Sequence, residues 1–548
     1  MKRILLLLLV VVSAAATLLN ACSNAGTSGD ALPDVVSYNY DVRPILSDKC
    51  FNCHGPDARK REAGLRLDIA SEAYKALQEH PQKHAIVPGK PEASELFARI
   101  TTSDTSLLMP KVSSKLPRLS EREVSIVKRW IEQGAKYEPH WAFVAPQQAA
   151  LPGVQDKSWP VNEIDYFILN KMERQALSPN EPADKERLLK RVCMDLTGIL
   201  PTPEETAAFV KDADEKAYEK QVDRLLQLPQ FGEKMAIGWM DLARFADSHG
   251  FQDDSYRSQW PWRDWVIHAF NSNYSYEKFL TWQLAGDLIE NPSKESILAT
   301  GFNRNHKITQ EGGVIDEEYR IEYVTDRTNT FGKAFLAMTF ECAKCHDHKY
   351  DPISQKDYFS TFAFFNQLPE KGYQGDIYSG FPADPPRITI TSAEVKDVLT
   401  FINKKDSLPV NVMVMKDTTL RPTHVLKRGE YDKPGDLVSF NVPNTIFPFD
   451  STRFPKNRLG LSQWLLHKDH PLTSRVIVNR IWQQFFGIGL VKTAEDFGVQ
   501  AETPIHRDLL DWLAADFVEN GWDLKRFIRQ VVTSQTYLQS SDRKSTRL

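Results

Sequence analysis

The chain has 548 residues, which is too long for one hydrophobic core and predicts about three domains. Hydrophobic residues make up 41% of the sequence and charged residues 26%, as is ordinary for a folded soluble protein. The formal net charge is −4, without the basic excess typical of nucleic-acid-binding proteins, so we expect no nucleic-acid partner.

Residues 1–22 predict a lipoprotein signal peptide. A short basic region precedes an apolar run that is shorter than the ~20 residues of a membrane-spanning helix. The sequence LNAC that ends it resembles a bacterial lipobox, in which Cys22 would be lipidated; the alternative is ordinary cleavage just before it. Residues 23–34 predict a flexible tether. We therefore expect export to the periplasmic side of the cell envelope, with the outer membrane favoured because Ser23 carries no negative charge.

Four of the six cysteines form two C-x-x-C-H motifs, at Cys50–His54 and at Cys342–His346. This spacing is the attachment signature of c-type haem. Cys50, Cys53, Cys342 and Cys345 are therefore the predicted covalent attachment points, and His54 and His346 the predicted iron ligands. The remaining internal cysteine, Cys193, lies in an apolar helical pattern and is expected to be a buried structural thiol.

The first predicted domain covers residues 35–140 and has the element order of a small cytochrome c. Helical spacing over 42–50 leads into the first motif, and Met109 stands before a proline far downstream. A thioether is a soft ligand suited to haem iron opposite histidine, so we predict Met109 as the distal ligand. Ser120 and Glu123 form a capping box that predicts a final helix.

Other interpretations of these residues are available. Met109 could be an ordinary core methionine, which is the usual role of methionine. Cys50 and Cys53 could form a disulfide or half of a zinc site, but zinc would need a second ligand pair, and the nearest lies almost three hundred residues away. Haem is the better interpretation for the first motif.

The second predicted domain covers residues 155–370 and is mainly helical. The helical patterns are 164–174, 185–196, 203–211, 217–228, 231–246, a helix from Trp260, 276–288 and a long stretch over 317–340.

The second motif, which follows the long stretch, predicts a second haem. The alternatives are a zinc site made by Cys342, Cys345, His346 and His348, which has poor geometry, and a Cys342–Cys345 disulfide. The distal ligand is open: His306 and His249 are candidates, although each is more often simply a hydrogen-bonded histidine. Without one, the iron would have an open position that permits small-ligand chemistry.

Acidic residues of the same domain could shape a substrate or calcium site. They are Asp253, Asp254, Glu311 and the run 316–318. Helix capping and solvated charge are the favoured interpretation, because negative charge suits a helix N-terminus for purely structural reasons.

In the rest of the chain the periodicity of apolar residues changes twice. Alternating strand patterns near 387–391 and 410–414 predict a small β-rich connector over 385–445. The helical period then returns and predicts a C-terminal helical bundle over 455–541, with helices at 504–519 and 524–532. Residues 542–548 are expected to be a non-native tail. The predicted fold class is therefore mainly α: a cytochrome c-like helical domain, a large helical middle domain, a small β-rich connector and a helical bundle.

Several long stretches together resemble the planctomycete-type multidomain cytochrome c lipoproteins. They are VRPILSDKCFNCHGPD, GLRLD and VKRWIEQGA in the first domain, with HWAF just afterwards. The middle contains RVCMDLTGILPTPEE, EGGVIDEEYRIEYVTDR and ECAKCHDHKYDPISQKDYF, and the part near the end contains RPTHVLKRGEYDKPGD and NRIWQQFFGIGLVKTAEDFG. The resemblance implies a cell-envelope cytochrome whose middle and C-terminal domains have no assigned activity. It also implies that the C-terminal domain is truncated here.

Three functions fit these observations. The leading one is electron transfer by covalent haem, with an unknown redox partner protein and a possible link to oxidation of a carbohydrate. The second is a haem peroxidase or oxidase with an open iron position at the second haem. The third is a carbohydrate-active or carbohydrate-binding module that carries a cytochrome domain. No G-x-S-x-G, H-E-x-x-H, Walker or dinucleotide-binding motif favours an ordinary hydrolase or a nicotinamide enzyme.

Overall fold

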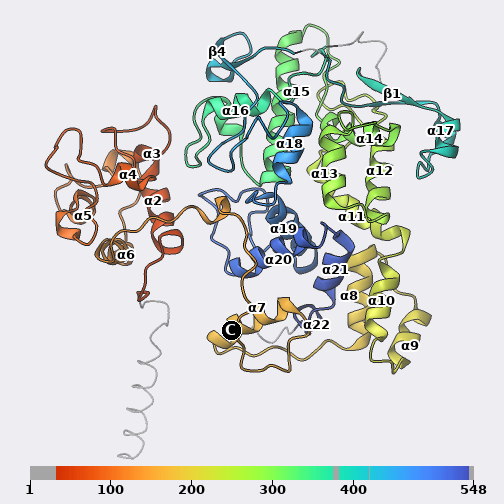
Figure 1. The fold of residues 1–548 in the computed structure, drawn as a ribbon, viewed down its shortest axis with the longest axis horizontal. Helices are drawn as coiled ribbons and strands as arrows, with labels where there is room; N and C mark the ends of the chain where they lie inside the picture. The colour runs from red at the N-terminus through yellow and green to blue at the C-terminus, as the bar shows by residue number, and fades with distance from the viewer. Residues whose placement is uncertain (1–31, 374–381, 419, 542–548) are drawn as a thin grey trace, which may run out of the picture. The chain divides into compact units, whose positions relative to one another are not determined.

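The computed structural model describes residues 32–373, 382–418 and 420–541, which form two compact units (Figure 1). The smaller unit contains the described residues up to His54, together with Glu62–Glu138. The larger unit contains Gly55–Arg61 and the described residues from Pro139 on. Cys22, the predicted signal peptide, most of the tether and the tail 542–548 lie outside the described residues.

The smaller unit is helical. A π-helical turn, η1 (Tyr38–Val42), leads directly into the first helix. The helices are α2 (Arg43–Lys49), α3 (Phe51–His54), α4 (Ala70–Ala73), α5 (Glu95–Thr101) and α6 (Glu121–Glu132). The predicted capping box is present: Ser120 accepts from the Glu123 N–H, and the Glu123 carboxylate accepts from the Ser120 N–H. The first and last helical segments pack together, with the rings of Tyr38 and Trp130 5.6 Å apart.

The larger unit contains most of the helices. Its helices up to the strands are α7 (Glu163–Arg174), α8 (Lys185–Thr197), α9 (Pro203–Lys211), α10 (Ala217–Leu225), α11 (Pro229–Leu242), α12 (Trp260–Asn271), α13 (Tyr276–Ala285), α14 (Lys294–Ala299), α15 (Asp316–Phe331) and α16 (Gln355–Phe362). The later helices are α17 (Ser392–Asp397), α18 (Arg458–Leu465), α19 (Thr473–Phe486), α20 (Arg507–Glu519), α21 (Leu524–Val532) and α22 (Gln535–Leu538).

The strands of the described residues form two small antiparallel sheets. Strands β1 (Arg387–Ile390) and β2 (Val410–Met413) pair with Arg387 opposite Met413, and β3 (Thr423–Leu426) and β4 (Pro434–Val438) pair with Thr423 opposite Val438. The fold is therefore mainly α, as the sequence predicts.

The predicted helix over 317–340 is wrong at its end. Helix α15 stops at Phe331, a π-helical turn follows over Gly332–Leu336, and Ala337 adopts a left-handed conformation with φ +47°. The following residues run without helix into the second C-x-x-C-H motif, because Met338 N–H closes the turn on Gly332 O at 3.0 Å. Buried apolar residues continue the sequence pattern here although the backbone has left the helix.

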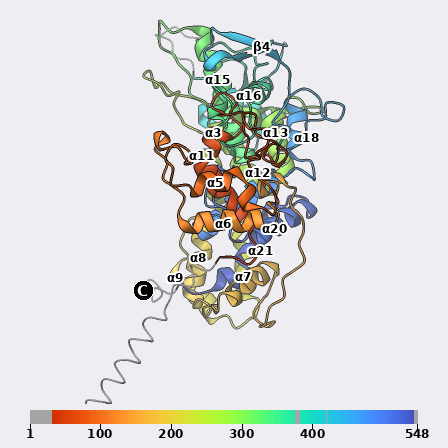
Figure 2. The ribbon, with the colours of Figure 1, turned by 90° about the vertical axis from the view of Figure 1, so that its left-hand side faces the viewer.

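A continuous hydrophobic core holds the larger unit together, from Trp141 to Tyr537. Within this unit, α7–α9 lie at the opposite end from α15, α16 and β4 in both ribbon views (Figures 1 and 2). Among the described helices, none combines the length and the apolar character that a membrane-crossing helix needs.

Candidate functional site

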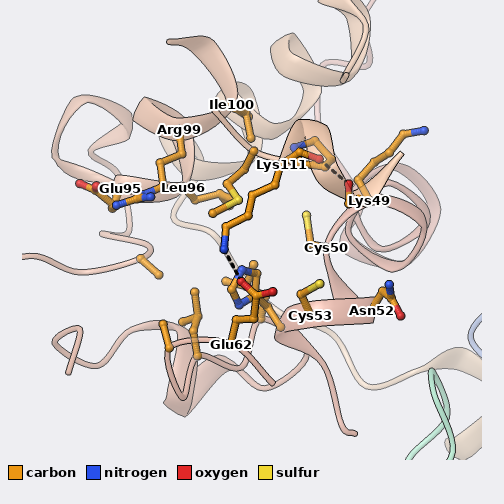
Figure 3. A pocket seen from close by; sticks show the side chains of 18 of the residues that line it. Lys49, Cys50, Asn52, Cys53, Glu62, Glu95, Leu96, Arg99, Ile100 and Lys111 are labelled. Atoms are coloured by element: carbon orange, nitrogen blue, oxygen red, sulfur yellow. Dashed lines mark hydrogen bonds and ion pairs between the residues drawn. The ribbon is translucent and has the colours of Figure 1, made fainter. Parts of the chain in front are cut away.

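The first C-x-x-C-H motif opens onto a cavity of about 530 Å³ in the smaller unit (Figure 3). Cys50 ends α2 and Cys53 and His54 lie in α3, so a short helical turn presents all three side chains to one space. Met109, more than fifty residues later, lines the same cavity. Its volume lies within the range of small-molecule sites, about 300–1,000 Å³.

Burial favours the neutral forms of Cys50 and His54 in the first motif. It raises the pKa of the Cys50 thiol to about 12. It also lowers the pKa of His54, with the neighbouring Glu62 carboxylate opposing part of that shift. A neutral imidazole is the form that binds a metal, and His54 Nδ1 is buried without a hydrogen-bond partner. Two thiols, an imidazole and a thioether around one apolar cavity fit a covalent haem with His and Met on its two faces.

Backbone hydrogen bonds fix the position of Met109. Its N–H donates to Arg99 O at 3.0 Å, and Leu108 beside it is buried. Arg99 belongs to α5, a helix that the sequence did not predict. Leu96 and Ile100, four residues apart on this short helix, supply part of the apolar wall. That i, i+4 spacing was the available signal, but a seven-residue helix gives too little periodicity to stand out.

The second motif lies on the surface of the larger unit. Cys342 and Cys345 are exposed and form no disulfide, and Ala343 between them is buried. His346 Nδ1 lies 2.7 Å from Asp347 O and must donate to it, because a carbonyl oxygen only accepts. With Nδ1 donating, the neutral ring has its lone pair on Nε2, as an iron ligand requires.

Two other segments of the larger unit pack against the second motif. Gly429, between β3 and β4, lies so close that a Cβ there would be 3.1 Å from the Cys345 sulfur. Gln355 donates to Lys344 O at 2.9 Å and to Leu426 O at 3.1 Å, which joins the motif to this hairpin.

A loop after α19 approaches the second motif from the C-terminal part of the chain. Val499 N–H donates to Asp351 Oδ1 at 2.7 Å, and Phe497 N–H donates to Ala337 O at 2.7 Å. The Ala337 backbone before the motif and the Asp351 side chain after it are therefore held by residues that come long after them in the sequence.

Hydrogen bonds hold the two histidines that the sequence suggested as a second distal ligand, and both ring nitrogens of His306 are engaged. His306 Nδ1 donates to Lys307 O, and its Nε2 accepts from Arg327 at 3.0 Å. His348 Nδ1 accepts from Asp351 N–H at 2.8 Å, and His249 Nδ1 accepts from Arg257 at 3.3 Å. Among the residues described, no group of three or more His, Cys, Asp or Glu is arranged to hold a metal ion.

The acidic groups of the middle domain have structural roles. Asp254 accepts from Gly250 N–H at 2.7 Å, Glu311 from Gln252 N–H at 2.6 Å and Asp316 from Tyr373 N–H at 2.9 Å. Asp316–Glu318 also begin α15, where negative charge stabilises the helix. Cys193 is buried in α8.

Three family models match the chain. Residues 50–112 match Planctomycete cytochrome C, a stretch that begins at the first motif and includes Met109. Residues 163–370 match a protein of unknown function (DUF1549), and residues 457–548 match a second one (DUF1553). Neither the curated proteins nor the solved structures gave a match.

Proposed function

Because this chain combines these three domains and so belongs to the planctomycete-type multidomain cytochromes c, we propose that it binds haem covalently and transfers electrons. In this proposal Cys50 and Cys53 attach one haem, and His54 and Met109 bind its iron. Cys342, Cys345 and His346 hold a second haem.

One observation carries the proposal: both cysteines of the first motif, His54 and Met109 line a single cavity. The disulfide and zinc alternatives give no reason for a methionine more than fifty residues away to face the same space. When bound, haem supplies a one-electron couple, and His/Met ligation raises its reduction potential. The chain contributes two thiols for attachment, the ligands on two faces and an apolar wall that limits water.

The decisive experiment is a haem count on full-length protein expressed with export. We expect two covalent haems in the intact mass and a Soret band. Replacing Cys50 and Cys53 by alanine removes one haem, and replacing Cys342 and Cys345 by alanine removes the other. Cys193→Ala is the matched control and leaves the count unchanged, since this thiol is buried in α8 and belongs to neither motif.

A colourless protein whose intact mass includes no porphyrin would contradict the proposal. A single haem, lost only in the Cys50/Cys53 variant, would remove the second site and leave the first. The two motifs are therefore tested separately.

A second candidate function applies to the second motif. Its thiols are exposed, and both ring nitrogens of His306 are engaged, by Lys307 O and by Arg327. These contacts favour an iron with an open position, which would permit peroxidase or oxidase chemistry. The Cys50/Cys53 variant isolates the second haem: a high-spin spectrum that shifts on adding cyanide supports this function, and a low-spin spectrum that does not shift contradicts it.

The location and partners of the protein are also proposals. The lipobox-like sequence supports a lipid anchor at Cys22 on the periplasmic side of the envelope, with the outer membrane favoured. Electrons would pass to or from a partner protein of unknown identity, and a carbohydrate is the proposed class of oxidised substrate. If the domains outside the cytochrome act on carbohydrate without haem, activity survives His54→Ala and His346→Ala together.

A further inference from the structure

An ion pair joins two sides of the cavity in the smaller unit. Glu62 belongs to the segment that follows the first motif, and its N–H donates to Cys53 O at 2.9 Å. Lys111 follows Met109 by two residues, and its Nζ lies 2.5 Å from Glu62 Oε2. Figure 3 shows the Lys111 side chain reaching across the cavity to this carboxylate.

The other charged groups of the cavity wall have different surroundings. Glu95 is paired with Arg99 of its own helix at 3.0 Å and with Lys83 at 3.1 Å, and Lys49 is paired with Asp48 at 2.6 Å. Glu79 and His80 also line the cavity. The Glu62–Lys111 pair differs from these because it connects the segment beside His54 with the segment beside Met109.

The pair contributes little to folding, since Glu62 is 47% and Lys111 50% exposed and such surface pairs are weak. Its charges act on what the cavity holds. Oxidation of haem iron adds one positive charge, so a nearby carboxylate stabilises the oxidised form and a nearby ammonium destabilises it. Water screens such effects less across an apolar cavity than across bulk solvent.

We propose that Glu62 and Lys111 set the reduction potential of the first haem from opposite directions. This inference rests on the proposed function. With both members present, the two effects largely cancel. Loss of the carboxylate raises the potential, and loss of the ammonium lowers it.

The test compares Glu62→Gln, Lys111→Gln and the double variant in full-length, haem-loaded protein at neutral pH. Each single variant is expected to change the equilibrium constant with a reference couple at least threefold, in opposite senses, which corresponds to about 28 mV for one electron. The double variant returns close to the wild-type potential. Raising the salt from about 0.01 to 1 M shrinks the shifts, because the Debye length falls from about 30 to 3 Å.

Glu72→Gln and Lys75→Gln are the matched controls. This pair, at 2.5 Å, lies on the same unit but does not line the cavity, so its loss leaves the potential unchanged. Equal or same-direction shifts for Glu62→Gln and Lys111→Gln would overturn the inference and indicate that the pair only holds the Met109 loop. Wild-type protein without haem at the first motif would instead overturn the proposed function.

Discussion

At the scale of single residues, Met109 carries the most specific prediction. Its side chain lines the same cavity as a motif that supplies histidine, and thioether ligation raises haem potential. Met109→Ala is therefore expected to keep the covalent haem, to gain a high-spin component and to lower the potential by a sizeable fraction of the ~0.8 V range that axial ligands span. Absorption spectra and a redox titration measure both effects.

Met194→Ala is a suitable comparison, because Met194 is 39% exposed on α8 and lies in the larger unit. Its spectrum and potential should match the wild type. A Met109→Ala protein with an unchanged low-spin spectrum would show that another residue binds the iron.

The burial of His470 leads to a prediction about how the free energy of unfolding depends on pH. Its ring is buried, its Nδ1 accepts from Leu472 N–H at 3.3 Å, and burial lowers its pKa to about 3. In the unfolded chain the same histidine titrates near pH 6.5, so below that pH the unfolded state binds more protons and stability falls. Between pH 7 and pH 5 the loss is about 2 kcal/mol.

Urea unfolding at the two pH values measures this loss. His470→Asn removes the titrating group, so its free energy of unfolding should depend less steeply on pH than that of the wild type. An identical pH dependence in both proteins would mean that His470 takes up its proton at the same pH in the folded protein as in the unfolded chain.

At the scale of elements, one buried carboxylate joins three segments of the middle domain. Arg304, at the end of the 3₁₀ turn Thr300–Arg304, donates to Glu370 at 2.7 Å, and Arg327 of α15 donates to it with both terminal nitrogens. Burial alone would raise the pKa of Glu370, but the guanidinium groups of Arg327 and Arg304 outweigh it and hold the pKa low.

Glu370→Ala is therefore expected to destabilise the protein by about 3–5 kcal/mol, because two arginines stay buried without their partner. Thermal or urea unfolding measures the change. Glu430→Ala, which removes an exposed partner of Lys433, should change stability by less than about 0.5 kcal/mol. If both variants changed the free energy of unfolding by equally small amounts, water would have to reach Arg304 and Arg327 in place of Glu370.

The elements also show what the sequence can predict. Helices with strong end signals appear where expected: Pro203 opens α9 after the Thr202 capping box, and α21 covers the predicted 524–532. The end of α15 and the helix α5 could not be predicted in this way. The first depends on a turn closed by Gly332 and Met338, and the second is only seven residues long.

Some residues of the candidate site can likewise be predicted from the sequence, and others cannot. Spacing alone indicates the thiols and their histidines, and the order of elements indicates Met109. The Nε2 atom of His306 is engaged because Arg327 donates to it, and the sequence alone cannot show that these two residues are neighbours. Glu62 and Lys111 carried no signal at all, since surface charges of this kind are common and only the fold brings them to one cavity.

At the scale of the whole molecule, the proposed lipid anchor at Cys22 makes a prediction about where the protein is located. Cys22→Ser is expected to move the full-length protein from the membrane fraction to the soluble periplasmic fraction, because acyl chains supply about 0.8 kcal/mol of membrane binding per buried CH₂. Fractionation with and without a high-salt wash measures this. Wild-type protein that a salt wash releases would contradict a lipid anchor and indicate an electrostatic contact.

The hydrogen bonds of Phe497 to Ala337 O and of Val499 to the Asp351 carboxylate, on either side of the second motif, have a consequence for biogenesis. Translation at roughly 5–20 residues per second delivers these two residues many seconds after Cys345. During that interval the nascent polypeptide presents the second motif without its final support, whereas every residue that lines the first cavity has been made by Leu119. We therefore expect the two motifs to mature in succession, with the one nearer the N-terminus finished while the other still awaits the end of synthesis.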